Sequence, residues 1–119
     1  MDIHFTARKF RARKELRDHA IASVRKLDKF FDGIVRGDII LSFERPTSSI
    51  KMAEITLHVH GATLAAKEKS DDYHKSLDLA VEKMERQLSK YKTKLRMKNK
   101  KTLRRVKQDV VASTMGEDE

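Results

Sequence analysis

The chain has 119 residues, with 27 lysines and arginines against 18 aspartates and glutamates, no cysteine, four glycines and one proline. This length supports one domain with a modest core. The composition excludes disulfides, cysteine-based zinc sites and a glycine-rich phosphate loop. No stretch is apolar enough for a signal peptide or a membrane span, so we expect a cytoplasmic protein. We also expect it to use no cofactor.

The first predicted elements are a strand and a helix. Residues 3–7 alternate apolar and polar side chains, which predicts a short strand. A basic connection over residues 8–13 follows, and then a helix over 14–31 that we expect to stop at Gly33. Arg13, just before this helix, is a poor N-cap. The apolar face of the helix consists of Leu16, Ala20, Val24, Leu27 and Phe31.

Three further strands are predicted in the middle of the chain, over residues 38–44, 52–60 and 63–69. Pro46 ends the first of them, residues 46–51 form a hairpin loop, and Gly61 begins the next turn. Residues 52–60 alternate clearly. One face carries Ile55, Leu57 and Val59, and the other carries Glu54, Thr56, His58 and His60.

A long helix is predicted over residues 71–97, with Asp71 as N-cap and Asp72 in the first turn. Its apolar residues recur every three or four positions for more than six turns. They are Tyr73, Leu77, Ala80, Met84, Leu88, Tyr91 and Leu95, all of which we expect to pack in the core. A second stripe, well round the helix from the first, consists of Lys83, Arg86, Lys90 and Lys94, with Gln87 beside it.

The positive charge is concentrated in one segment. Residues 83–107 hold twelve lysines and arginines against one acid, Glu85, whereas residues 1–82 hold fifteen against thirteen. Residues 108–119 carry four acids and no base. Because so few acids are available within the basic segment to pair with its cations, a polyanionic partner such as RNA explains it better than a solvated helix face.

The order β-α-β-β-β-α predicts an α+β fold in two layers. A right-handed crossover makes the first strand pair parallel, and short loops make the others antiparallel. We expect a four-stranded sheet with both helices on one face. Residues 1–97 would form this domain, and residues 98–119 a charged, disordered tail.

Three short motifs carry a resemblance to a known family. They are DDY at 71–73, EKMERQLSKYK at 82–92 and RKLDKFFD at 25–32. With the element order, they make residues 1–97 resemble the ribosome hibernation promoting factor and ribosome-associated inhibitor family, also called sigma-54 modulation proteins, in its short form. The resemblance implies a fold like that of double-stranded-RNA-binding domains.

The family occupies the mRNA and tRNA channel of the small ribosomal subunit and keeps ribosomes inactive under stress. The resemblance therefore implies the small subunit and its ribosomal RNA as partners, with no membrane, no small-molecule substrate and a monomer off the ribosome. Matching positions and the basic stripe give the expected RNA-binding residues. They are Arg25, Lys26, Lys29, Lys83, Arg86, Gln87, Lys90, Lys92 and Lys94.

Two other functions compete with this interpretation. A generic structured-RNA-binding module would need the basic helix and no ribosomal role. A small metal-dependent hydrolase would use His58 and His60, with His4 on a neighbouring strand. The chain offers no nucleophile or carboxylate cluster at a fitting spacing. We therefore expect no enzyme and no metal, and we interpret the histidines as polar residues of an exposed sheet face.

Overall fold

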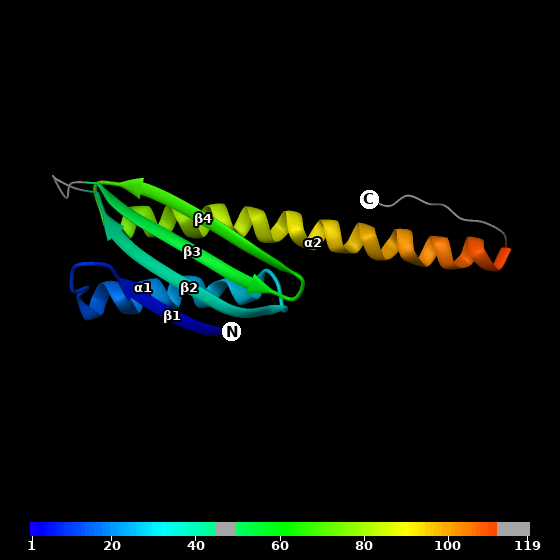
Figure 1. The fold of residues 1–119 in the computed structure, drawn as a ribbon, viewed down its shortest axis with the longest axis horizontal. Helices are drawn as coiled ribbons and strands as arrows, with labels where there is room; N and C mark the ends of the chain where they lie inside the picture. The colour runs from blue at the N-terminus through cyan, green and yellow to red at the C-terminus, as the bar shows by residue number, and fades with distance from the viewer. Residues whose placement is uncertain (45–49, 112–119) are drawn as a thin grey trace. The chain divides into compact units, whose positions relative to one another are not determined.

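The computed structural model describes the backbone of residues 1–44 and 50–111 and the side chains of residues 1–44 and 50–97. The elements follow in the order that the sequence predicts (Figure 1). They are β1 Asp2–Ala7, α1 Lys14–Arg25, the 3₁₀ helix η1 Lys26–Lys29, β2 Ile34–Phe43, β3 Lys51–Val59, β4 Ala62–Ser70 and α2 Tyr73–Val111. The chain divides into two compact units, Met1–Leu88 and Ser89–Glu119, and α2 contributes to both.

The four strands form one sheet in the order β1-β2-β3-β4. β1 pairs with β2 in parallel, and the β2–β3 and β3–β4 pairs are antiparallel, as predicted. One row of residues in register crosses all four strands on the inner face: Phe5, Ile39, Ile55 and Ala66. Since successive side chains alternate between faces, the neighbouring row lies on the open face. That row is His4, Asp38, Thr56 and Ala65.

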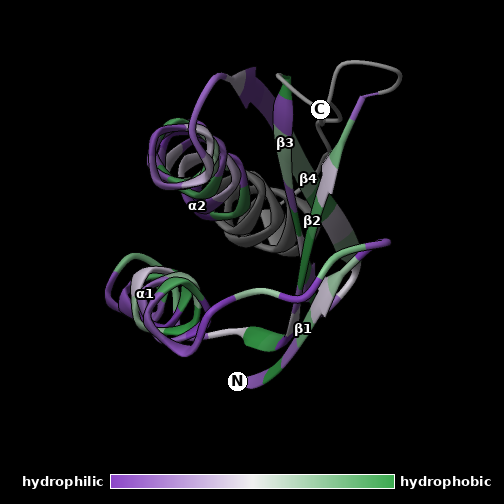
Figure 2. Ribbon diagram, turned by 90° about the vertical axis from the view of Figure 1, so that its left-hand side faces the viewer, coloured by the Kyte–Doolittle hydropathy of each residue, from purple (hydrophilic) through white to green (hydrophobic). Residues whose placement is uncertain are grey.

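The core lies between the sheet and the two helices. α1 and the first part of α2 cover the same face of the sheet (Figure 2). The fully buried large side chains come from every layer, with Leu27 from η1, Ile39 and Leu57 from the sheet, and Leu77 and Leu88 from α2. Burying one such side chain contributes roughly 1.5–3 kcal/mol. The predicted two-layer α+β fold is confirmed.

The start of α2 is fixed by a hydrogen-bond network. The Asp72 carboxylate accepts a bond from the Lys75 backbone N–H at 3.1 Å, so Asp72 is the N-cap, and the prediction of Asp71 is wrong. The Ser76 hydroxyl, fully buried, donates to the Lys51 carbonyl at 2.7 Å and lies 2.6 Å from the Ser70 hydroxyl. These bonds join the beginnings of β3 and α2 to the end of β4.

Several predicted boundaries differ from the observed ones. The first helix tightens to a 3₁₀ turn and ends at Lys29, before Gly33, so Gly33 does not stop it. β2 begins at Ile34, and a register irregularity between Ile34 and Arg36 leaves Val35 62% exposed. Most of the predicted loop over residues 46–51 lies outside the described residues.

Two boundaries matter for function. The sequence predicted that His58 and His60 share one face of a strand. β3 ends at Val59, so His60 lies beyond the strand and this prediction is wrong. Helix α2 continues past Met97 to Val111. The division into a domain of residues 1–97 and a tail of residues 98–119 stays a prediction. Within the described part of the chain, no helix has the length and apolar character needed to cross a membrane.

Candidate nucleic-acid interface

The first group of predicted RNA-binding residues lies where α1 passes into η1. Val24 and Leu27 on this segment are fully buried and fix its inner side. Arg25, Lys26 and Lys29 are exposed, and none of the three forms an ion pair with any described side chain. Burial of the apolar residues therefore holds three unneutralised cations on the outer surface of the helical layer.

The second group, on the part of α2 that belongs to the first unit, is exposed but paired. The Lys83 ammonium lies 3.5 Å from the Glu68 carboxylate of β4, and the two side chains are 48% and 31% exposed. Arg86 lies 3.8 Å from Glu82, one turn earlier on the helix. Exposed ion pairs of this kind contribute about 0–1 kcal/mol, so a phosphate can replace the carboxylate at little cost.

Gln87 has a structural partner. Its side-chain N–H donates to the backbone carbonyl of Ala65 on β4 at 2.7 Å. β4 is an edge strand of the sheet, and this bond satisfies one of its outward backbone groups. The side chain is half-buried. Direct contact of Gln87 with RNA stays a prediction, and the structure shows that the same amide also attaches α2 to the sheet.

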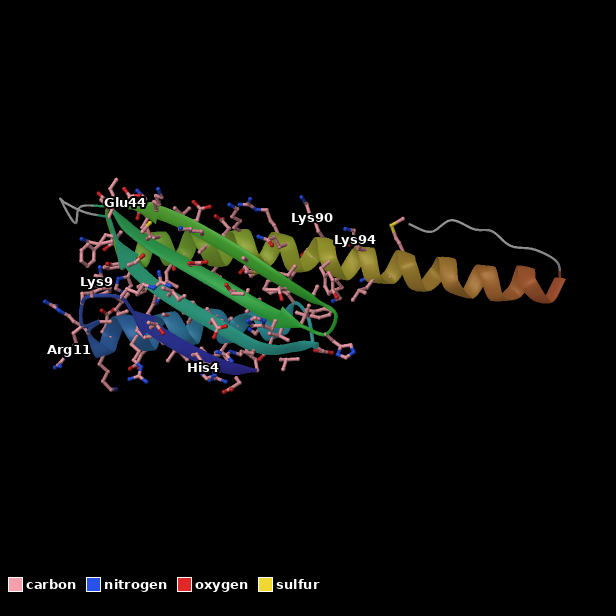
Figure 3. The ribbon with its side chains drawn as sticks, viewed as in Figure 1. His4, Lys9, Arg11, Glu44, Lys90 and Lys94 are labelled. Carbon is pink, nitrogen blue, oxygen red and sulfur yellow. The ribbon has the colours of Figure 1, made fainter. Side chains whose placement is uncertain are left out.

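The third group belongs to the second unit. Lys90, Lys92 and Lys94 are exposed on α2. Figure 3 shows Lys90 and Lys94 extending from the same side of the helix, as expected for residues four positions apart. Successive cations at this spacing lie about 5–6 Å apart along a helix.

A further basic cluster lies in the connection between β1 and α1, which was predicted to be basic over residues 8–13 but was not counted among the RNA-binding residues. This cluster does not stand out in the net charge of residues 1–82, because their acids nearly balance their bases. In the structure, six exposed cations gather between residues 8 and 17. They are Arg8, Lys9, Arg11, Arg13, Lys14 and Arg17.

The sequence analysis also missed two histidines between the helices. His19 of α1 lies 3.1 Å from the Asp78 carboxylate of α2, and His74 of α2 lies 2.9 Å from Glu15 of α1. The two imidazole rings are 4.8 Å apart. The pairs line or border a groove of about 670 Å³ between α1 and α2, which also contains Lys26. Glu15 precedes His19 by four residues, and His74 precedes Asp78 by four. This repeated spacing is the feature of the sequence that could have indicated the two pairs.

The histidines of the predicted catalytic alternative do not come together. His58 lies 3.0 Å from the Asp38 carboxylate, and His4 lies 3.1 Å from Asp2. Arg36 donates to the other oxygen of Asp38 at 3.0 Å. Among the residues with described side chains, no three histidine or carboxylate groups are placed to hold a metal ion. The open face thus carries local ion pairs, in line with its interpretation as a polar sheet surface.

Asp38 makes this face sensitive to acid. Burial alone would raise the Asp38 pKa, but the hydrogen bonds and charges of Arg36 and His58 outweigh it and hold the pKa below its ordinary value of 3.8. A carboxylate of lowered pKa stabilises the fold above its unfolded-state pKa. That contribution disappears as the pH falls through the folded-state pKa.

We therefore expect Asp38→Asn to lower the free energy of unfolding by about 0.5–1.5 kcal/mol at pH 7. Urea unfolding at pH 7 and at about pH 3 measures this free energy. The difference in free energy of unfolding between variant and parent should shrink at the lower pH. Asp18→Asn is the matched control, because Asp18 is 60% exposed and pairs with the exposed Lys14. A gap that is the same at both pH values would contradict the role assigned to Asp38.

The fold and these surfaces together define a class: a small α+β protein that presents cations from both helices and has mixed charge on its open sheet face. A family model described as "Sigma 54 modulation protein / S30EA ribosomal protein" matches residues 3–96. The chain belongs to this family.

Relatives and solved structures agree with this assignment. The chain is 32% identical over 96 residues to a ribosome hibernation promoting factor of Klebsiella oxytoca, covering 81% of this chain and 98% of the relative. The corresponding protein of Escherichia coli K12 is 30% identical over the same coverage. A ribosomal subunit interface protein of Coxiella burnetii has a similar structure, with a TM-score of 0.71 and 29% identity, covering 78% of this chain and 99% of that one.

Proposed function

We propose that this protein binds the small ribosomal subunit in the channel used by mRNA and tRNA and keeps ribosomes inactive under stress. The observation that carries the proposal is membership of the family over residues 3–96, with relatives named as hibernation factors that match over almost their whole length. We further propose that it acts in the cytoplasm as a monomer off the ribosome, with no catalytic activity and no cofactor.

The physical basis of binding is neutralisation of RNA phosphates by the two helices. The proposed contacts are the nine residues predicted from the sequence, of which Gln87 also bonds to Ala65. Cations about 5–6 Å apart along a helix match the spacing of phosphates along a strand, and such contacts give affinity without reading bases. Folded ribosomal RNA is then recognised by its shape and backbone, since the major groove of A-form RNA is too narrow to read.

A generic structured-RNA-binding module is the alternative. It would use the same exposed cations, so the surface alone does not separate the two functions. The family assignment favours the ribosomal function, because the relatives are named for ribosome hibernation. The two functions differ in whether binding depends on the particle or only on the presence of structured RNA.

The test is sedimentation of the purified protein with isolated ribosomal subunits. We expect it to pellet with the small subunit and not with the large one, although both contain structured RNA. Prior occupation of the channel by mRNA and tRNA should reduce the bound fraction, since the ligands would share a site. Equal sedimentation with both subunits would support the generic module, and binding unaffected by tRNA would contradict the channel as the site.

A further inference from the structure

The connection between β1 and α1 has a concentration of positive charge that the helices do not explain. Residues 8–17 contain six lysines and arginines and one acid, Glu15. Figure 3 shows Lys9 and Arg11 extending outward from this connection. Lys14 pairs with Asp18 at 3.2 Å, whereas the other five cations form no ion pair with the side chains that the structure describes.

The connection is held in one conformation. The Arg8 backbone N–H donates to the Leu41 carbonyl at 2.9 Å, which ties its beginning to β2. The Phe10 ring stacks on Tyr73 with 4.9 Å between ring centroids and meets the edge of Phe43 at 6.2 Å. Between these anchors Lys9 has a φ of 63°, a left-handed conformation that a residue with a side chain rarely adopts. The flanking cations are therefore presented by a fixed backbone.

A small cavity of about 280 Å³ opens beside the connection. Its lining combines two cationic residues, Arg8 and Lys9, with Phe43, Met52 and Ser42. Cations next to an apolar and aromatic wall are the combination with which proteins hold a single-stranded nucleotide: the phosphate meets the charge and the base or ribose meets the wall.

This arrangement costs stability in the free protein. The five unpaired cations repel one another, and Lys14 and Arg17 stand in the first turn of α1, where the helix dipole disfavours positive charge. Arg13 as N-cap supplies no side-chain hydrogen bond to offset this. A polyanion reduces these repulsions, because its phosphates neutralise the five cations that have no carboxylate partner among the described side chains.

We propose that the β1–α1 connection, residues 8–17, is a second RNA-binding surface, which takes the phosphate backbone of a single-stranded segment and one nucleotide in the adjoining cavity. This second surface rests on the proposed function, to which it adds a further site of contact with the RNA. The helices and the connection would be separate anchors on the same RNA-containing particle, so losing either should weaken binding without altering the other.

The test changes Lys9, Arg11 and Arg13 together to Gln and measures affinity for small ribosomal subunits at about 0.1 M salt. Each phosphate contact contributes about 0.7–0.9 to the slope of log affinity against log salt. Three lost contacts should therefore flatten the slope by two to three and weaken binding about a hundred- to five-hundredfold at this salt. Circular dichroism verifies the fold. If the triple variant does not fold, Arg11→Gln alone should flatten the slope by about one.

The matched control removes three cations from the open sheet face, Arg36, Lys67 and Lys69, all changed to Gln. It has the same net charge as the test variant, and we expect its affinity to fall less than threefold. Parent protein that does not bind subunits would refute the proposed function itself. Parent that binds, with the connection variant equal to the parent or to the control, would refute this inference alone.

The absence of cysteine allows a direct check. Arg11→Cys places a single thiol on the connection, to which a photo-crosslinker can be attached. On small subunits we expect crosslinks to ribosomal RNA. Crosslinks to ribosomal protein alone, in a complex that forms normally, would overturn the assignment of RNA as the partner.

Discussion

Changing Lys83, Arg86 and Lys90 together to Ala should reduce association with the small ribosomal subunit at least a hundredfold while the fold stays intact. Each side chain is exposed and lies off the apolar side of α2. Binding should fall because three phosphate contacts are lost at once, each of them favoured by counterion release. Co-sedimentation at moderate salt measures the loss.

Stability should change little. The variant loses the Lys83–Glu68 and Arg86–Glu82 pairs, which are exposed and worth about 0–1 kcal/mol each. The buried residues of the same helix, Leu77 and Met84 among them, are untouched. Thermal unfolding should confirm this. A triple variant that still pellets with small subunits would exclude this stripe as the anchor.

The control is again the open-face set of Arg36, Lys67 and Lys69, here changed to Ala. It removes the same number of positive charges from the opposite face of the sheet. If non-specific attraction between a basic protein and RNA were the cause, both variants would lose affinity equally. We expect the control to retain almost all of it, because exposed charges more than about 10 Å from the RNA are screened at physiological salt.

The main features of the fold could be predicted because they follow from periodicity. Of the seven apolar positions predicted for the core on the long helix, Leu77, Ala80, Met84 and Leu88 are buried. The other three are only partly buried: Tyr73, Tyr91 and Leu95. Alternation along residues 52–59 placed Ile55 and Leu57 in the core. The strand order followed from the handedness of crossovers and from the short loops between later strands.

The local features that differ depend on contacts between distant elements. Asp71 and Asp72 are equally good caps in sequence, and Asp72 is the N-cap in a structure where the Ser70 hydroxyl also bonds to the Asp72 backbone. The early start of β2 reflects pairing of Ile34 with Val59 across the sheet. Such local features depend on contacts between distant elements, and these contacts cannot be predicted from one short stretch of sequence.

The candidate site shows the same division. Sequence spacing located the exposed cations of α2 and of the α1–η1 segment. It could not reveal that Glu68 of β4 neutralises Lys83 or that Gln87 bonds to Ala65, because those partners lie far away along the chain. Acids outside residues 83–107 therefore pair with some of the cations within that segment. The structure also brings together His19, His74 and their carboxylates from two helices, although these residues are 59 positions from their partners.

The salt dependence of binding should be steep for the intact protein. Log affinity should fall linearly with log salt, by about 0.7–0.9 for each phosphate contact. The helices alone offer five to eight contacts, which gives a slope of about −4 to −7. These cations are Arg25, Lys26, Lys29, Lys83, Arg86, Lys90, Lys92 and Lys94. Titrations on small subunits at several salt concentrations measure the slope.

Single substitutions then assign the slope to residues. Lys90→Gln should flatten the slope of log affinity against log salt by about one, since the exposed Lys90 would make one phosphate contact. Lys67→Gln, on the open face of β4, should leave it unchanged. Because these contacts carry no base identity, a scrambled structured RNA should give a similar slope with lower affinity, and the difference between the two affinities measures recognition of shape. A nearly flat slope for the intact protein would mean instead that packing against ribosomal protein drives binding, since apolar contacts release no counterions.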